Sequence, residues 1–315
     1  MSTLTNRLYA GPDDLQAMLQ LLFAVRPAAR LADYPGPVDL RELLALPAVQ
    51  VNTRLWLDSN GRLVAFAFVD QYDNLRFEMD PQTSYPDLGR EIVGWGVACL
   101  RRAMSAGDET RTLDASCRED DAGQIALLER HGFVRQELRS LRLVRRLTEP
   151  IPPPQLPPGF AIRHVQGEQE VAALVALHRA AFGTEYMTAA ERLAMMRGLE
   201  YEAELDLVVV AADGRLAAYC LCAISQEENE RTGRQEGHTD PAATHPDFQR
   251  RGLARALLLT GLRLLQERGM DTAVLGTSSD NPAMLGTAQS VGFQVQTATC
   301  WFSRPVSGVP VTAMR

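Results

Sequence analysis

The sequence lacks the features that would point to a membrane, secreted or metal-binding protein. No stretch approaches the ~20 continuous apolar residues of a membrane span. Residues 1–14 show no basic segment followed by an apolar one, so we expect no signal peptide. The 5 cysteines are odd in number and show no Cys-x-x-Cys spacing, which leaves a zinc site without its paired ligands. We therefore expect no metal, and buried, reduced thiols in a cytoplasmic protein.

An excess of positive charge is also missing. The formal net charge is −7 and the isoelectric point is about 5.4. This balance argues against a nucleic-acid-binding surface as the main function. It also makes the local basic cluster Gln249-Arg250-Arg251 conspicuous.

The length and the prolines predict two domains. A chain of 315 residues suggests about two domains. The segment 148–159 holds six prolines, which forbid a helix and favour an extended, semi-rigid linker. We expect one domain over 1–147, a proline-rich linker over 148–159, and a second domain over 160–315.

An internal repeat links the two predicted domains. Asn60-Gly61 and Asp213-Gly214 each favour a tight hairpin turn between two strands. Gly132 and Gly292 each precede a phenylalanine. Their separation along the chain is nearly the same as that of the two turn glycines, Gly61 and Gly214. Each half therefore reads as a helix, a strand hairpin, a further strand, a long helix, a strand, a helix and a last strand. The predicted fold class is α/β, a mixed sheet of α+β type built twice.

The stretch HPDFQRRGLARALL at 245–258 begins a predicted helix that runs to about Arg268. Arginines at a helix N-terminus oppose the helix dipole, so they do not serve helix stability. They make sense if an anion docks on the free N–H groups of the first turn, where Gly252 permits close backbone approach. The alternative is a solvated basic turn.

This stretch resembles the acetyl-CoA-binding segment of the GNAT superfamily of N-acetyltransferases. Downstream, NPAMLGTAQSVGF at 281–293 is similar to the second signature of that superfamily, although the register of its alanine is loose. The repeat extends the resemblance over nearly the whole chain. It implies two tandem GNAT-like domains, an acetyl-CoA co-substrate and a small-molecule amine acceptor, in an acyltransferase that acts as a monomer or a homodimer.

The resemblance also implies which residues hold acetyl-CoA. Backbone groups of the strand would pair with the pantetheine arm, an N–H near Thr244 would stabilise an oxyanion, and the helix start would hold the pyrophosphate. Asn281 would contact the arm near the thioester, or else it is only a helix N-cap. The implied set is Ala242, Ala243, Thr244, Gln249, Arg250, Arg251, Gly252, Leu253, Ala254, Arg255 and Asn281.

Acyl transfer to an amine often needs a general base. Glu236, His238 and Asp240 alternate along the strand that leads into the cofactor segment, so they share one face. Asp240 and Glu236 are the candidates for the base or for binding the acceptor ammonium. The alternative is solvated charge at a strand start. We expect the preceding residues 226–237 to form a solvated loop.

Two departures from the family pattern leave a second function open. The tyrosine that often protonates the departing thiolate falls seven residues after Asn281, and that position is Ala288. In the first half, Pro86, Asp87 and Glu91 occupy the corresponding cofactor segment. The proline has no N–H to donate, and the two carboxylates would repel a pyrophosphate. We expect a degenerate first domain. The rival to an enzyme is an acetyl-CoA-binding sensor or interaction protein.

Overall fold

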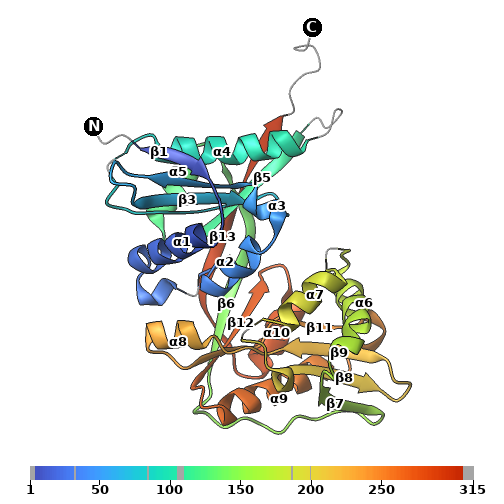
Figure 1. Ribbon diagram of the computed structural model, residues 1–315. Coiled ribbons are helices and arrows are strands. Elements are labelled where there is room, and N and C mark those ends of the chain that lie inside the picture. Colours follow the sequence, from blue (N-terminus) through green and yellow to red (C-terminus); the bar gives the residue numbers. More distant parts are fainter. Residues whose placement is uncertain are drawn as a thin grey trace. The chain divides into compact units, whose positions relative to one another are not determined.

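The computed structural model describes residues 4–31, 33–83, 85–104, 110–185, 187–198 and 200–307. The contacts of the chain divide it into two compact units. Unit 1 comprises Met1–Arg139 together with Thr299–Arg315, and unit 2 comprises Ser140–Ala298. Figure 1 labels the helices and strands of both units.

Unit 1 is a mixed sheet covered by helices on both faces. Its strand order is β1-β2-β3-β4-β5-β13, where β13 (Gln294–Ser307) comes from the end of the chain. Among the described strands, β4 and β5 pair in parallel and the other neighbours pair antiparallel. The elements are β1 (Thr5–Leu8), α1 (Pro12–Val25), α2 (Pro37–Leu44), α3 (Pro47–Gln50), β2 (Thr53–Leu57), β3 (Leu63–Val69), β4 (Asn74–Met79), α4 (Leu88–Ala103), β5 (Thr110–Arg118), α5 (Ala122–Arg130) and β6 (Val134–Arg146).

Strand β3 explains the layering of unit 1, because all of its residues are buried. Phe66 and Phe68 belong to the core beneath α1 and α2. Ala65 and Ala67 alternate with them and belong to the core beneath α4. The period of two in a strand sends these two sets to opposite faces, so a strand without polar positions sits between two layers of helices.

Unit 2 repeats this order of elements. Strands β7-β8-β9-β11 form one antiparallel sheet, and β6-β12-β10 form a second group. The elements are β7 (Phe160–His164), α6 (Val171–Phe182), α7 (Ala189–Met196), β8 (Asp206–Ala211), β9 (Leu216–Leu221), α8 (Gln226–Thr232), β10 (Glu236–His238), β11 (Ala242–Thr244), α9 (Leu253–Glu267), β12 (Thr272–Ser278), α10 (Pro282–Ser290) and β13 (Gln294–Ser307).

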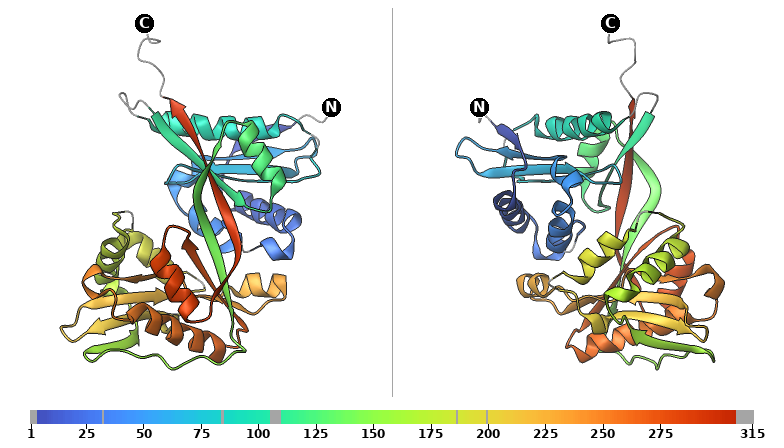
Figure 2. Two further views of the ribbon diagram at one scale, coloured as in Figure 1. Left: turned by 180° about the vertical axis from the view of Figure 1, so that it is seen from behind. Right: turned by 45° about the vertical axis from the view of Figure 1, so that its right-hand side comes forward.

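Helices α6 and α9 cover opposite faces of the β7-β8-β9-β11 sheet. Tyr219 and Ala243 point to the α6 side and share a core cluster with Leu174. Ala218 and Cys220 alternate with Tyr219 along β9 and lie in the core that α9 fills with Leu257 and other leucines. Figure 2 shows the two layers from further sides. The mixed α/β fold predicted from the sequence is confirmed.

The predicted hairpin turns and the long helix are also confirmed. Gly61 and Gly214 have φ of +78° and +84°, the left-handed region that the two turns require. Helix α9 begins at Leu253 and ends at Glu267, and Gly269 follows with φ of +83°. A residue in this conformation stops a helix at little cost only when it is glycine.

The last strands of the two halves are exchanged between the units. In unit 1, residues 299–307 of β13 pair antiparallel with β5 from Thr110 to Arg118. In unit 2, residues 140–146 of β6 pair antiparallel with β12. The compact units thus follow the exchanged strands, whereas the predicted domains 1–147 and 160–315 describe the repeat in the sequence and stay a prediction.

The segment 226–237 is not the loop we expected, because its first half forms helix α8. Ser225 caps the helix by accepting a hydrogen bond from the Glu228 N–H, and Gly233 ends it in the left-handed conformation. The Asn229 side chain bonds both the N–H and the carbonyl of Glu236, at 3.0 and 2.8 Å. These bonds attach α8 to the start of β10.

The proline-rich segment lies against unit 2. Residues 151–157 form no helix or strand, and Ile151 and Leu156 pack against the core beneath α9. Arg263 of α9 donates a hydrogen bond to the Ile151 carbonyl at 3.0 Å. In the described part of the chain, no helix is long and apolar enough to cross a membrane, and no group of His, Cys, Asp and Glu side chains could hold a metal.

The strand exchange predicts that two phenylalanines close in sequence stabilise different units. Phe302 is buried in the unit 1 core and Phe293 in the unit 2 core. Each Phe→Ala substitution should cost about 3–5 kcal/mol because it leaves a cavity. By native-state hydrogen exchange, Phe302→Ala should expose the amides of β5 and α4, and Phe293→Ala those of α9 and β12. Faster hydrogen exchange of the unit 2 amides in the Phe302→Ala variant would contradict the strand exchange.

Candidate functional site

The candidate site in unit 2 begins where one strand breaks into two. β10 pairs in parallel with β12 from Glu236 to His238, and the Thr239 N–H donates a hydrogen bond to the Val274 carbonyl at 2.9 Å. After Thr239 the chain leaves β12, and β11 pairs with β9 instead. The strands therefore diverge, and β11 has an edge that no described strand covers.

Ala242 and Thr244 present backbone groups at this edge. The Pro241 carbonyl and the His245 N–H bond to β9, at Leu221 and Ala217. Because bonding direction alternates along an antiparallel strand, Ala243 also faces β9. The N–H and C=O groups of Ala242 and Thr244 then face the opening, where the Gln249 side chain bonds the Thr244 carbonyl at 3.4 Å. The predicted strand thus offers backbone donors and an acceptor to a ligand.

Asp240 lies at the point of divergence. Its carboxylate accepts a hydrogen bond from the Gly276 N–H of β12, and a Cβ on Gly276 would lie only 3.1 Å from Oδ2. Oδ1 is buried and has no partner in the described structure. Burial raises the pKa of Asp240, against the opposing effects of His238, the Gly276 N–H and Arg142. A buried, incompletely bonded carboxylate is typical of a functional site.

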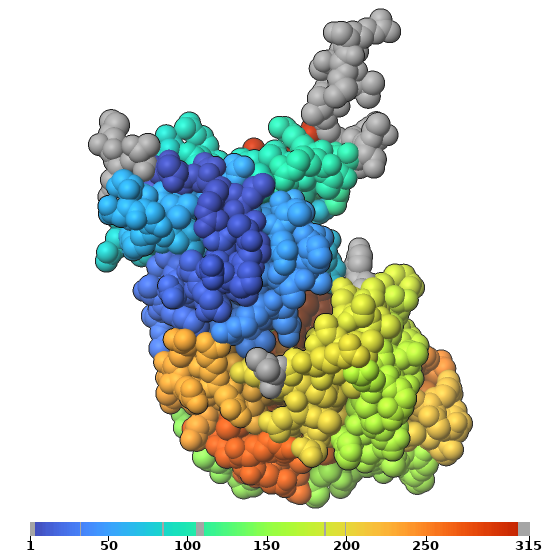
Figure 3. All heavy atoms as spheres, in the orientation of Figure 1, coloured from blue at the N-terminus to red at the C-terminus, as the bar shows by residue number. Residues whose placement is uncertain are grey.

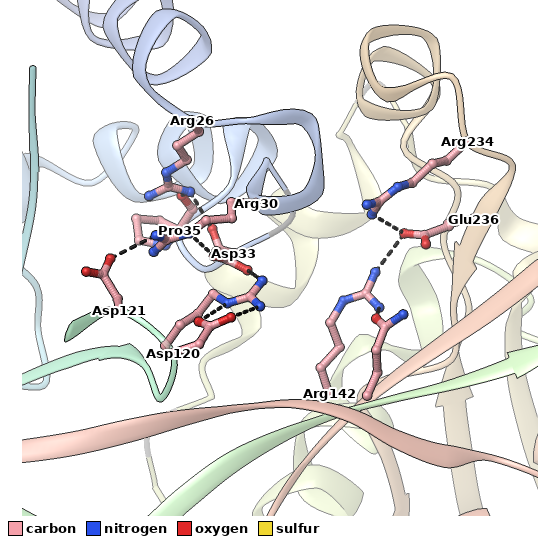
Figure 4. Close-up of polar contacts among 11 residues, drawn as sticks. Arg26, Arg30, Asp33, Pro35, Asp120, Asp121, Arg142, Arg234 and Glu236 are labelled. Atoms are coloured by element: carbon pink, nitrogen blue, oxygen red, sulfur yellow. Dashed lines mark hydrogen bonds and ion pairs between the residues drawn. The ribbon is translucent and has the colours of Figure 1, made fainter. Parts of the chain in front are cut away.

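Glu236, the other carboxylate candidate, has two arginine partners (Figure 4). Arg142 lies 2.7 Å and Arg234 3.5 Å from its Oε2. Arg142 also donates to the Gln296 side chain at 3.1 Å. Because the strand breaks after Thr239, Glu236 and Asp240 do not share the continuous strand that we predicted, and no contact between them is found.

The turn before α9 presents a row of free N–H groups. Arg250 and Gly252 have φ of +60° and +79°. Among the residues that the structure describes, the six backbone N–H groups from Arg250 to Arg255 have no hydrogen-bond acceptor. No side chain caps the helix, and a Cβ at Gly252 would meet nothing within 4 Å. Such a cradle of amides at a helix N-terminus suits an anion.

The arginines add fixed charge to this cradle. Arg250 and Arg251 are exposed and Arg255 is half-buried. Arg251 lies over the Phe160 and Phe248 rings, at 5.8 and 5.7 Å from their centroids, and donates to the Asp247 carbonyl at 3.3 Å. Aromatic stacking fixes its guanidinium near the turn. Leu253 is buried in the core, whereas Ala254 is half-buried, and both offer their backbone N–H groups at this turn.

Asn281 and Ala288 lie on helix α10. Asn281 caps the helix, its Oδ1 accepting the Met284 N–H at 3.0 Å, which is the structural role that the sequence left open. Its side-chain amide has no partner among the described residues. Ala288 is fully buried in the core with α9. The position that carries a proton donor in the family pattern therefore contributes packing only.

A small pocket on the other face of the sheet could not be predicted from the sequence. His178 lines this pocket together with Tyr219 and Pro241. The His178 Nδ1 lies 2.7 Å from the Tyr219 hydroxyl. Nothing in the spacing of these residues along the chain places them together.

The corresponding opening in unit 1 is filled by its own side chains. β4 pairs with β5 only at Asn74 and Leu75 and then diverges. Arg76 crosses the divergence and donates to the Ser116 hydroxyl at 2.6 Å. Its guanidinium also lies over the rings of Tyr34 and Trp301, 4.9 and 5.1 Å from their centroids.

Ion pairs hold the segment after α1 over this side of unit 1 (Figure 4). Arg26 pairs with Glu78 of β4 at 2.6 Å and donates to the Pro35 carbonyl at 3.0 Å. Arg30 pairs at 2.8 Å with Asp121, the residue that caps α5. The segment is thus fixed to β4 and to the helix that corresponds to α10.

The start of α4 also differs from that of α9. Glu91 accepts hydrogen bonds from the Tyr85 hydroxyl and the Trp56 ring, both at 2.8 Å. A Cβ on Gly89 would lie 3.0 Å from the Leu127 side chain. A carboxylate and packed side chains therefore occupy the place where α9 offers open amides.

Comparison with known proteins finds a family match within unit 2. Residues 171–293, from the start of α6 to Phe293, match the model of the acetyltransferase (GNAT) family. These residues are a GNAT acetyltransferase domain. The domain includes the strand divergence, the turn at 249–255 and Asn281. The family assignment supports an acyltransferase, and the resemblance predicted from the sequence is confirmed.

Longer similarities extend beyond the GNAT domain. A protein of Thermobispora bispora named mycothiol acetyltransferase is 27% identical over 299 residues, which cover 93% of this chain and 97% of that protein. One of the same name from Nocardiopsis dassonvillei is 28% identical over 332 residues, with 95% and 97% coverage. A tandem GNAT protein from the clavulanic acid biosynthesis pathway superimposes with a TM-score of 0.72 at 19% identity, covering 98% of this chain and all of the other (100%). The tandem GNAT fold is shared with this structure.

The raised pKa of Asp240 predicts a pH-dependent effect of Asp240→Asn on stability. The ionised carboxylate is disfavoured in the folded state, so its contribution to stability is full at low pH and is lost as the pH rises through the folded-state pKa. The asparagine has no charge to bury. Urea unfolding at neutral pH should therefore give the variant the higher free energy of unfolding, and the gain should vanish below the usual pKa range of aspartate.

Asp271→Asn provides the control, because Asp271 is exposed. It should change the free energy of unfolding by no more than about 0.5 kcal/mol at either pH, as surface substitutions do. A loss of stability at neutral pH on Asp240→Asn would contradict the account of Asp240.

Proposed function

We propose that the chain is an acetyl-CoA-dependent N-acetyltransferase whose active site lies in unit 2 and whose acceptor is a small-molecule amine. The observation that carries the proposal is the row of free N–H groups from Arg250 to Arg255, flanked by arginines. A pyrophosphate carries the negative charge and the oxygen acceptors that such a turn lacks.

The other residues around the turn fit the rest of this co-substrate. The open edge of β11 offers the N–H groups of Ala242 and Thr244 and the Ala242 carbonyl to an amide-bearing arm such as pantetheine. The Asn281 amide would lie toward the same arm while its oxygen keeps the helix cap. Gln249 and Gly252 shape the turn, and Ala243 and Leu253 hold it to the core.

Acetyl-CoA supplies a thioester whose acyl carbon an amine attacks directly. An amine is protonated in neutral water, so a base must remove its proton before attack. Asp240 is the better candidate, because its Oδ1 has no partner and burial raises its pKa. Glu236, with two arginine partners, would serve by fixing Arg142 beside Asp240.

Unit 1 supports a single site for each chain. Its strand divergence is crossed by Arg76, and the start of α4 carries Glu91. We propose that unit 1 is a degenerate copy that binds no acetyl-CoA.

The similarity to proteins named mycothiol acetyltransferase supports a small-molecule acceptor. The 5 buried free thiols support a reducing, cytoplasmic setting. We propose that the protein has neither a nucleic-acid nor a membrane partner. We also propose that it acts as a monomer or a homodimer.

The combined variant Arg250→Glu with Gly252→Asp should abolish the binding of acetyl-CoA. It places negative charge in the cradle without filling occupied space, since nothing lies within 4 Å of a Cβ at Gly252. Loss of two charge-assisted contacts should raise the dissociation constant about 100-fold or more, as measured by calorimetric titration. Asp87→Ala, at the corresponding place in unit 1, should leave the affinity unchanged. An unaltered affinity in the double variant would refute the site.

A binding protein without catalysis is the second candidate, and buried Ala288 favours it, because this position has no proton to give. Release of free thiol from acetyl-CoA over a panel of amines separates the two. For an enzyme, Asp240→Asn should lower kcat/KM about 100-fold, as loss of a general base does.

The direction of the Asp240 pKa shift sets the pH profile of that enzyme. Activity should fall as the pH drops through the raised pKa of Asp240, so the acidic limb should lie above the usual range of aspartate. Asp240→Asn should remove that limb while leaving the binding of acetyl-CoA intact. Binding without thiol release from any amine would favour the sensor.

A further inference from the structure

The carboxylate of Asp240 lies against a strand position that has no side chain. Gly276 of β12 donates its N–H to this carboxylate, and a Cβ at Gly276 would lie 3.1 Å from Oδ2. That distance is shorter than an ordinary van der Waals contact, so a side chain here would displace the carboxylate. The bare backbone of Gly276 therefore fixes where the Asp240 carboxylate lies.

The residue beside this glycine on the next strand is Arg142. Arg142 of β6 is the register partner of Gly276 in the antiparallel pair of β6 and β12. Register partners point to the same face of a sheet, so the Arg142 side chain lies on the face that carries the Asp240 carboxylate. Burial raises the pKa of Asp240, and the positive charges of His238 and Arg142 oppose that rise.

Two side chains hold the Arg142 guanidinium in this position. It donates to Glu236 Oε2 at 2.7 Å (Figure 4) and to Gln296 Oε1 at 3.1 Å. The side chains of Arg142 and Glu236 are only 18% and 12% exposed, so solvent screens their charges little. Arg234, the other partner of Glu236, follows helix α8, which lies on the face of unit 2 that is turned toward the viewer in Figure 3.

The other titratable groups around Asp240 do not replace the charge of Arg142. His238, on β10, is half-buried, and a histidine gains or loses its charge near neutral pH. Cys220 of β9 is buried, and a hydrogen bond with Cys222 together with burial raises its pKa, so its thiol is neutral. Arginine stays protonated at every pH that the protein meets. Arg142 therefore gives Asp240 a positive neighbour whose charge does not change with pH.

The corresponding place in unit 1 has neither the glycine nor the arginine. Ser116 of β5 occupies the position of Gly276 in the internal repeat, and its register partner is Trp301. The Ser116 hydroxyl accepts a hydrogen bond from Arg76 at 2.6 Å. The glycine and Arg142 are thus found together in the unit for which we propose catalysis.

We infer that Arg142 is a positioning residue of the proposed acetyl transfer, which keeps the carboxylate on Gly276 ionised so that it can take a proton from the acceptor amine. The inference rests on the proposed function and adds a residue to it. The proton moves from the ammonium nitrogen, which keeps the electron pair, to a carboxylate oxygen of Asp240. Residues 140–146 of β6 belong to unit 2, so a strand from the first half of the repeat completes the site of the second.

Substitution of Arg142 should move the acidic limb of the pH profile and leave the plateau unchanged. Arg142→Gln removes the charge, so Asp240 binds its proton more tightly and kcat/KM on the acidic limb should fall about tenfold. On the plateau the carboxylate is ionised in both proteins, and kcat/KM should agree within about twofold. Arg142→Lys keeps the charge and should restore the limb. A merely structural role would lower kcat/KM equally at every pH, which overturns the inference.

Glu236→Gln tests the same interaction with the opposite sign. It removes the carboxylate that balances Arg142, so kcat/KM on the acidic limb should rise by about twofold or more. Arg146→Gln is the matched control, because Arg146 is exposed on the same face of β6. It lies about 13 Å along the strand from Arg142, beyond the range of a screened charge, and should leave the limb in place. A limb that Arg142→Gln does not move, or that both other variants move in the same direction, overturns the inference.

Two further measurements separate failure of the inference from failure of the proposed function. Calorimetric titration should give each variant the parent affinity for acetyl-CoA, which also shows that it folds. Carbon-13 NMR titration follows the Asp240 carboxyl without any amine, and Asp240→Asn identifies its signal. The midpoint should rise in Arg142→Gln and fall in Glu236→Gln. An unmoved midpoint in a protein that acetylates an amine defeats the inference alone. The expected movement without thiol release from any amine defeats the proposed transfer, and with it the role of Arg142 in that transfer.

Discussion

A strand that pairs with one neighbour for three residues and then changes to another creates the open strand edge on which the candidate site depends. Because β10 pairs with β12 whereas β11 pairs with β9, the backbone groups of Ala242 and Thr244 have no strand partner on one side. The carboxylate of Asp240 lies at the fork, bonded to Gly276. Buried backbone groups must be satisfied, so a ligand with amides of its own complements this edge. The free turn before α9 then lies at the end of the same segment.

The two units show that this divergence belongs to the fold, whereas an open site depends on a few side chains. Unit 1 has the same fork between β4 and β5, but Arg76 crosses it and bonds Ser116. Trp301, on the strand exchanged from the end of the chain, lies against the Arg76 guanidinium. The strand exchange thus gives unit 1 part of its core as well as part of the closure of its fork.

The features encoded by neighbouring residues could be predicted from the sequence. The turns at Gly61 and Gly214 and the start of α9 each depend on local backbone conformation, and the motif at 281–293 placed Asn281 at a helix start. Helix α8 was missed because it has no apolar face, although Ser225 and Glu228 carry the N-cap spacing that could have revealed it. The strand exchange could not be predicted, because the last strands of a repeat suit either unit. Nor could the pocket at His178 and Tyr219, which tertiary packing alone brings together.

The central claim is that the turn from Arg250 to Arg255 binds a pyrophosphate. Amide chemical shifts of ¹⁵N-labelled protein, titrated in parallel with coenzyme A and with pantetheine, measure this contact residue by residue. Coenzyme A should shift the six amides of the turn, and pantetheine, which lacks the pyrophosphate, should shift those of Ala242 and Thr244 but not the turn. Shifts at the start of α4 in unit 1, or an undisturbed turn at saturating coenzyme A, would contradict the account.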